Sequence, residues 1–192
     1  MIQRIFHPVG QGAFYSERHE NHNIVYDCGS MSVNKGKKIV SQSFSKEDVI
    51  DILFISHFDY DHISLIEDLK TTVKEIRNVV IPLLHRNEKI LLSNVFKALG
   101  EYSLASLVDN PNKFFGAETG IISVQVYKKK INSKKGETTN IKTINLTNIK
   151  QNRKIPSGTP ITIENYSDWV FIPFNYKYKD RSKEFLDKLE SD

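Results

Sequence analysis

Cysteine is nearly absent from this chain, which excludes disulfide bonds within it. Cys28 is the only cysteine among 192 residues, a pattern that fits the reducing cytoplasm. Long apolar runs are also missing, and no stretch approaches the roughly 20 residues of a membrane-spanning helix. The first residues, MIQRIFHPVGQG, lack the apolar core and the small-residue cleavage site of a secretory signal. We therefore expect a cytoplasmic protein with no membrane association.

A strong excess of either charge is missing as well. Lys and Arg number 27 against 23 Asp and Glu, a formal net charge of +4, which is weak evidence for a polyanionic partner. With 39% hydrophobic and 26% charged residues, the composition is that of an ordinary soluble globular protein. The length suits one sizeable domain, or two small ones.

Short apolar patterns of two kinds alternate along the chain, which predicts a mixed α/β sheet layered with helices. Residues 30–48 are expected to form an irregular connection with room for a short helix. Segment 128–154 carries nine Lys or Arg against one Glu and is predicted to be a basic surface insertion within a single domain, 1–192. The predicted strands are 2–9, 13–17, 24–29, 50–56, 75–84, 120–127, 160–163 and 168–174, and the predicted helices are 63–72, 86–99, 103–108 and 179–189.

The stretch IDILFISHFDYDH, residues 50–62, places four metal-capable side chains directly after a buried strand. They are His57, Asp59, Asp61 and His62. Imidazole suits zinc and iron, whereas carboxylates favour harder ions such as Mn²⁺ and Mg²⁺. Side chains of both types in one small volume often hold two metal ions. The alternative is a polar loop whose side chains cap the following helix, with Asp61 as the N-cap residue.

Three motifs occur in order along the first part of the chain: VGQG at 9–12, the strand ending in Asp27-Cys28-Gly29, and ISHFDYDHI at 55–63. Together they resemble the metallo-β-lactamase superfamily. The similarity is to its SHxDxDH branch, as in the hydrolase-like domain of DNA-uptake channel proteins of the ComEC type. It covers residues 1–85 well and becomes diffuse afterwards. The fold that it implies is an αββα sandwich, of which this chain would be the incomplete, N-terminal portion.

The resemblance also implies roles for five side chains. His57 and Asp59 would belong to a first metal subsite, and Asp61 and His62 to a second. Asp61 would also act catalytically, by orienting or deprotonating the attacking water. Asp27 would brace the metal loop through hydrogen bonds instead of binding metal. Two zinc ions are the expected cofactor, and the carboxylate-rich ligand set also admits Mn or Fe.

The sequence departs from the family pattern after His62. The family usually has Gly-Gly where this chain has Ser64-Leu65. It also takes further ligands from later in the chain, namely a histidine, a bridging aspartate and a final histidine. Here only His85 follows, too early and between a strand and a helix, while Asp109, Asp168 and Asp180 have no supporting motif. A half-sandwich would leave an apolar sheet face for a partner chain or a second copy to cover.

The leading hypothesis is therefore a metal-dependent hydrolase that acts on phosphoester or nucleic-acid-type substrates through a metal-activated water. The rival is a catalytically incomplete, half-length member that acts as a protein-interaction or regulatory module. A third hypothesis is a nucleic-acid-binding module that works through segment 128–154, although that segment lacks the interleaved aromatic residues of single-strand binders.

Overall fold

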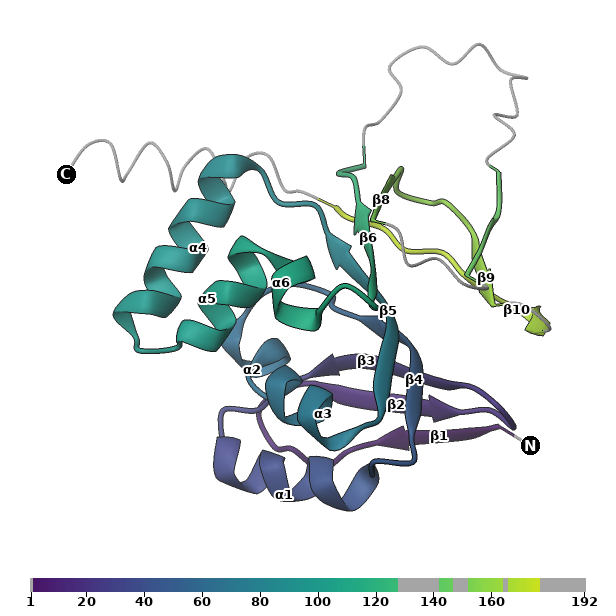
Figure 1. Cartoon of the computed structure of the whole chain (residues 1–192), viewed down its shortest axis with the longest axis horizontal. Helices are drawn as coiled ribbons and strands as arrows, with labels where there is room; N and C mark the ends of the chain where they lie inside the picture. The colour runs from purple at the N-terminus through teal and green to yellow at the C-terminus, as the bar shows by residue number, and fades with distance from the viewer. Residues whose placement is uncertain (1, 128–141, 147–151, 164–165, 177–192) are drawn as a thin grey trace, which may run out of the picture.

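The structure is a computed structural model that describes residues 2–127, 142–146, 152–163 and 166–176. Its main element is a seven-stranded sheet with the order β1-β2-β3-β4-β5-β6-β8 (Figure 1). The first three strands form an antiparallel meander, and β3 to β8 run parallel to their neighbours. The strands are β1 (Gln3–Phe6), β2 (Phe14–Arg18), β3 (Asn23–Cys28), β4 (Val49–Phe54), β5 (Glu75–Pro82), β6 (Gly120–Val124) and β8 (Arg153–Ile155).

Hydrophobic cores lie on both faces of this sheet, because successive residues of a strand point to opposite sides. Leu53 of β4 is fully buried in the core beneath the helices, whereas its neighbour Ile52 is fully buried in the core on the other face. The continuous apolar run in β4 predicted a strand buried on both faces, and the structure confirms it.

Six helices of the described chain cover one face of the sheet (Figure 1). They are α1 (Val33–Ser43), α2 (Tyr60–Ile63), α3 (Ile66–Thr72), α4 (Arg86–Ala98), α5 (Tyr102–Asp109) and α6 (Pro111–Phe115). Each contributes at least one side chain to the same core, namely Val40, Ile63, Ile66, Phe96, Leu104 and Phe114. No helix in the described residues is long and apolar enough to cross a membrane.

A second, three-stranded sheet covers part of the opposite face, with the order β10-β9-β7. Its strands are β7 (Ile144–Asn145), β9 (Ile161–Ile163) and β10 (Tyr166–Phe171). They pack on the main sheet through Ile161, Ile163 and Phe171. The mixed α/β class is thereby confirmed. Within the described residues the layers are helix, sheet and sheet, three of the four layers of the expected αββα sandwich.

The connection at 30–48, predicted to have room for a short helix, contains helix α1, eleven residues long. In α4 the apolar residues recur at helical spacing, but only part of that face is buried. Of its apolar side chains Phe96 is buried, whereas Leu91 and Val95 are exposed, because α4 lies outermost and packs on α5 instead of the sheet (Figure 1).

The proposed basic insertion at 128–154 is only partly described. Its described residues include β7, which pairs with β9, and most of β8, which pairs with β6. Leu146 is buried between the two sheets. The rest of that segment, and the helix predicted at 179–189, lie outside the described residues.

Candidate metal centre

The metal loop, residues 55–65, leaves the carboxyl end of β4 and includes α2. The sequence predicted one helix over 63–72, but the structure has α2 from Tyr60 and, after a break at Ser64 and Leu65, α3. The break arises because the Leu65 N–H donates to the carbonyl oxygen of Cys28, 3.0 Å away in β3. Asp59, and not Asp61, is the N-cap residue of α2, and its side chain makes no capping hydrogen bond. Helix capping therefore does not account for these carboxylates.

Two glycines on neighbouring segments lie close against the backbone of this loop. A Cβ atom on Gly29 would lie 2.5 Å from the carbonyl oxygen of Asp61, and one on Gly12 would lie 2.8 Å from the same oxygen. Gly12 also has a φ of 149°, which other residues rarely adopt. The Ala13 N–H donates to this oxygen at 3.0 Å. The VGQG and Asp-x-Gly motifs thus allow the close packing that places Asp61.

Asp27 links the end of β3 to the metal loop. Its side chain is buried, and its Oδ1 accepts a hydrogen bond from the Ser56 N–H at 2.7 Å. Its Oδ2 accepts from the Ser56 hydroxyl at 2.6 Å and lies 2.9 Å from His62 Nδ1. Asp27 is also the one non-glycine residue with positive φ in the described chain, at 51°, a backbone conformation that costs energy. These contacts are those of a bracing residue.

The hydrogen bonds assign the tautomers of both histidines. Asp27 accepts only, so His62 carries a proton on Nδ1. The Ser56 hydroxyl donates its single proton to Asp27, so at 2.8 Å it accepts from His57 Nδ1. Both imidazoles are thereby held through Nδ1, which leaves Nε2 as the atom that can bind a metal. The two ring centroids lie 3.8 Å apart.

Asp59 supplies a carboxylate beside these rings. Its Oδ2 lies 3.3 Å from His57 Nε2. With the proton on Nδ1, these are two acceptor atoms facing each other, an arrangement that a cation between them stabilises. That cation is a proton or a metal ion. The donor chemistry of His57, Asp59 and His62 therefore fits a divalent transition metal.

The predicted ligands do not form a complete site by themselves. Within the described residues, no group of three or more His, Cys, Asp or Glu side chains is arranged to hold a metal ion. His85 is the N-cap residue of α4, in a capping box with Glu88. Asp109 accepts hydrogen bonds from Ser93 and Lys97. The side chain of Asp168 and all of Asp180 lie outside the described residues. The roles assigned to His57, Asp59, Asp61 and His62 stay predictions.

Two serines matter more than the sequence suggested. Ser56 links Asp27 to His57 through hydrogen bonds. Its position directly before His57 in the sequence was the signal that could have identified it. Ser64, which stands where the family usually has glycine, donates to the Ser30 carbonyl and accepts from the Ser30 N–H, both at 2.9 Å. Cys28 is fully buried, and burial raises the pKa of its thiol, as expected of a structural cysteine.

These features define an α/β protein with a histidine- and aspartate-rich loop at the carboxyl edge of its sheet. Comparison with known protein families finds one that shares this part of the chain. Residues 8–88 match the model of the metallo-beta-lactamase superfamily.

Two further comparisons concern the whole chain. No curated protein matches the chain. Among solved structures, it is similar to a Thermotoga maritima protein provisionally assigned as a metallo-beta-lactamase, with 14% identity and a TM-score of 0.37. That match covers 67% of this chain and 57% of the other, so the chain spans little more than half of the Thermotoga protein.

Proposed function

We propose that this chain carries the metal loop of a metal-dependent hydrolase. Members of the superfamily matched by residues 8–88 typically bind divalent metal ions. The observation that carries the proposal is the unit formed by Asp27 and Ser56, which holds His57 and His62 through Nδ1. That is the support expected of metal-binding histidines, because a held Nδ1 fixes both the tautomer and the ring orientation.

The proposed roles of the loop residues in metal binding and catalysis differ. His57 and Asp59 would hold a first metal ion, and Asp61 and His62 a second. A bound divalent ion lowers the pKa of water and stabilises developing negative charge. Asp61, whose backbone is fixed by Gly29, would orient the attacking water and take up its proton. Zinc is the proposed metal, with Mn or Fe as alternatives for a carboxylate-rich set.

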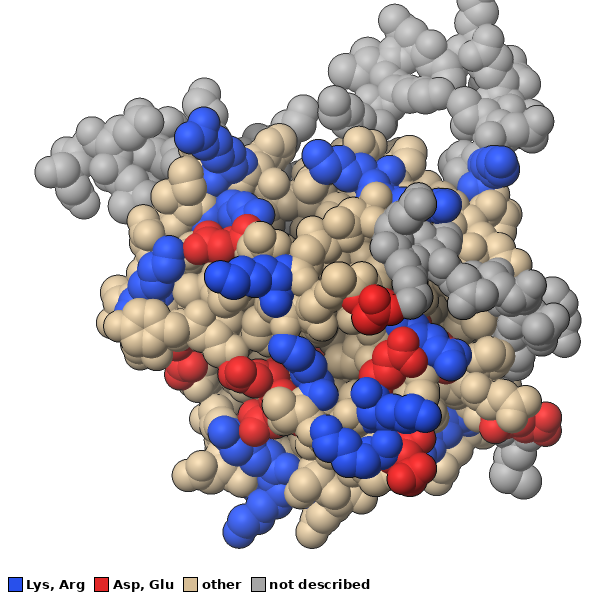
Figure 2. Space-filling view, viewed as in Figure 1, with Lys and Arg blue, Asp and Glu red and all other residues tan. Residues whose placement is uncertain are grey.

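A phosphoester or nucleic-acid-type substrate is proposed on two grounds. One is the SHxDxDH form of the loop, and the other is the formal net charge of +4. On the face shown in Figure 2, however, Lys and Arg side chains are interspersed with Asp and Glu. The described part of that face carries no continuous basic surface. The single cysteine supports a cytoplasmic location.

Zinc titration of the full chain by calorimetry tests the metal site. His57→Ala and His62→Ala should each weaken zinc binding at least about tenfold. His85→Ala, which alters an exposed histidine outside the loop, is the matched control and should bind zinc as the wild type does. Equal zinc affinity in all four proteins would contradict the metal site. Unchanged hydrolysis of a phosphodiester by His57→Ala would contradict the activity.

A catalytically incomplete interaction module is the second candidate, and two observations favour it. In the described chain no three candidate ligands converge. Large apolar side chains are also exposed near the second sheet, with Phe6 83%, Ile172 54% and Phe174 63% accessible. A well-folded dimer or complex that does not bind zinc, seen by size-exclusion chromatography, would support this candidate. A zinc-binding, active monomer would reject it.

A further inference from the structure

A cavity of about 320 Å³ opens on the face of the main sheet opposite the helices. Its floor comes from three neighbouring strands, through Glu17 of β2, Tyr26 of β3 and Phe54 of β4. One wall is residues 169–173, at the end of β10. The cavity therefore lies where the three-stranded sheet stops covering the seven-stranded one. None of the candidate metal ligands lines it.

Four of the eight residues that line the cavity are aromatic. Tyr26 and Phe54 are stacked, with centroids 5.0 Å apart and an interplanar angle of 12°. Phe171 lies 5.3 Å from Phe54, and Trp169 lines the same cavity. The face of an aromatic ring attracts cations because its π-electrons carry partial negative charge.

Glu17 brings a carboxylate into this aromatic lining. The residue is only 5% exposed, and a buried carboxylate is costly unless it is paired. Its Oε1 accepts a hydrogen bond from the Tyr15 hydroxyl at 2.8 Å, and its Oε2 lies 3.2 Å from His19 Nε2.

The chain already places one cation at the rim of this cavity. Arg4 Nε lies 3.8 Å from Glu17 Oε1, and the Arg4 guanidinium carbon lies 5.2 Å from the centroid of Trp169. The Arg4 side chain is 54% exposed, so solvent screens this long contact. Trp169 and Glu17 thus accept a cation together, while the cavity beside them offers further ring surface.

We propose that this cavity binds an alkylated ammonium group, such as the trimethylammonium head of a small ligand or a methylated lysine side chain. Tyr26, Phe54 and Trp169 would contact the methyl groups, and Glu17 would balance the positive charge. A neutral group of the same shape would gain only the apolar contact, so charge decides the ligand class. The proposal does not depend on the metal loop.

Trp169 is the only tryptophan of the chain, so tryptophan fluorescence reports on this cavity directly. The full chain would be titrated with choline and, separately, with its neutral isostere 3,3-dimethyl-1-butanol, at constant ionic strength. Choline should give a saturable fluorescence change, with an affinity at least about tenfold higher than that of the alcohol. Equal affinities, or no saturable change with choline, would overturn the proposal.

Substitutions locate the binding and separate charge from shape. Glu17→Gln keeps an acceptor for Tyr15 and should weaken choline binding at least about fivefold while leaving the alcohol unaffected. Glu75→Gln, at a partly exposed glutamate of β5 outside the cavity, is the matched control. Arg4→Met removes the competing cation and should tighten choline binding.

Phe54→Leu gives a test that does not depend on how well Glu17→Gln folds. It removes a ring face but keeps an apolar side chain, so choline binding should weaken more than alcohol binding, as measured by calorimetry. Choline binding unchanged in folded Glu17→Gln, or in Phe54→Leu, would overturn the proposal.

Discussion

Two buried aspartates tie opposite ends of the same pair of strands, β3 and β4, and their surroundings differ. At the carboxyl end, Asp27 of β3 accepts the N–H of Ser56, which follows β4. At the amino end, Asp51 of β4 accepts the N–H of Asn23, which begins β3, at 2.9 Å. Each carboxylate thus links one strand to the backbone of its neighbour.

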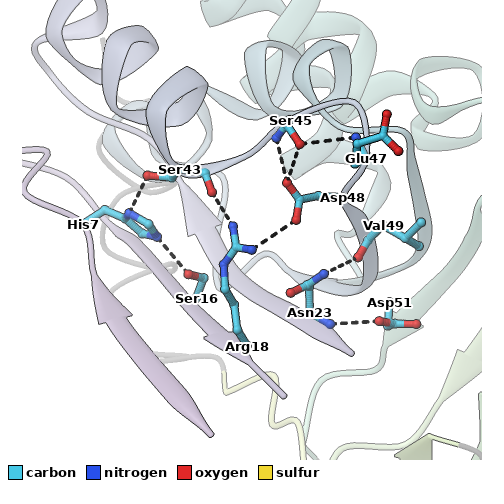
Figure 3. Close-up of polar contacts among 10 residues, drawn as sticks. All are labelled: His7, Ser16, Arg18, Asn23, Ser43, Ser45, Glu47, Asp48, Val49 and Asp51. Atoms are coloured by element: carbon cyan, nitrogen blue, oxygen red, sulfur yellow. Dashed lines mark hydrogen bonds and ion pairs between the residues drawn. The ribbon is translucent and has the colours of Figure 1, made fainter. Parts of the chain in front are cut away.

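The amino end is closed by permanent cations and amides. Arg77 donates to Asp51 at 2.8 Å. Figure 3 shows Arg18 between Asp48, 3.1 Å away, and the carbonyl of Ser43. An arginine stays charged at all accessible pH values and has no lone pair to offer. His22 Nδ1 also lies 3.4 Å from Asp51 Oδ1, but Arg77 donates to that same oxygen, so this carboxylate stabilises the fold.

At the carboxyl end Asp27 contacts the N–H and hydroxyl of Ser56 and the imidazole of His62, and Ser56 in turn contacts His57. The side chains of His57 and His62 are 44% and 24% exposed, and each ring is held through Nδ1, which leaves Nε2 for another partner. The two ends show that the same kind of link, a buried aspartate that accepts a backbone N–H, can serve stability or chemistry. Which of the two it serves depends on the other side chains that contact the carboxylate. At the amino end Arg77 makes it a structural tie, and at the carboxyl end His62 would make it the support of a metal ligand.

The largest effect is expected at the amino end. Asp51→Ala removes the acceptor of the Asn23 N–H and the partner of Arg77, and should lower the free energy of unfolding by about 3 to 4 kcal/mol. Urea denaturation measures it, with Asp68→Ala as the control. Asp68 forms a surface pair with Lys37 at 3.3 Å, worth less than about 1 kcal/mol. Similar losses in the two variants would show that Asp51 is no structural tie.

A second prediction concerns pH and His7, which follows β1 and contacts Ser43 at the end of α1. His7 is buried between the Ser16 and Ser43 hydroxyls, and burial, with a contribution from Arg18, lowers its pKa from 6.5 to about 4. As the pH falls below 6.5 the unfolded chain takes up this proton first. The stabilisation is therefore complete above pH 6.5 and is lost as the pH approaches 4, by about 2 to 3 kcal/mol.

Urea denaturation across this pH range tests that slope. His7→Gln should remove the contribution of His7 between pH 6.5 and 4, whereas His85→Gln, at an exposed histidine, should leave it in place. An unchanged slope in His7→Gln would assign the pH dependence to other groups.

The smallest effect separates the two ends most sharply, because it changes the same residue type at each. Ser56→Ala removes the hydroxyl that holds His57 and should weaken zinc binding about tenfold, while lowering the free energy of unfolding by about 1 kcal/mol. Ser43→Ala removes a hydroxyl 3.1 Å from His7 Nδ1 and should cost similar stability with no change in zinc affinity. If both variants bound zinc with equal affinity, Ser56 would not be needed to position His57.

Local sequence patterns predicted most strands of the main sheet, because the apolar pattern of a strand is contained within a few consecutive residues. For helix α1 the sequence predicted only room for a short helix within 30–48, since this segment is polar and contains Gly36. That glycine is explained by tertiary packing, because a Cβ there would lie 2.4 Å from Leu65 Cδ1. Phe174, the last residue of the predicted strand 168–174, is 63% exposed, which shows that aromatic content alone does not predict burial at the margin of a partly covered sheet.

The sequence by itself determined which donors are present and where they stand: two histidines and two aspartates within six residues, directly after a buried strand. Only the tertiary structure decided which nitrogen of each histidine is held, because Asp27 contacts Ser56 and His62 across 29 and 35 residues. It also brought Trp169 beside Tyr26 and Glu17 in one cavity. Contacts of that span depend on strand order and sheet packing, which no local pattern encodes.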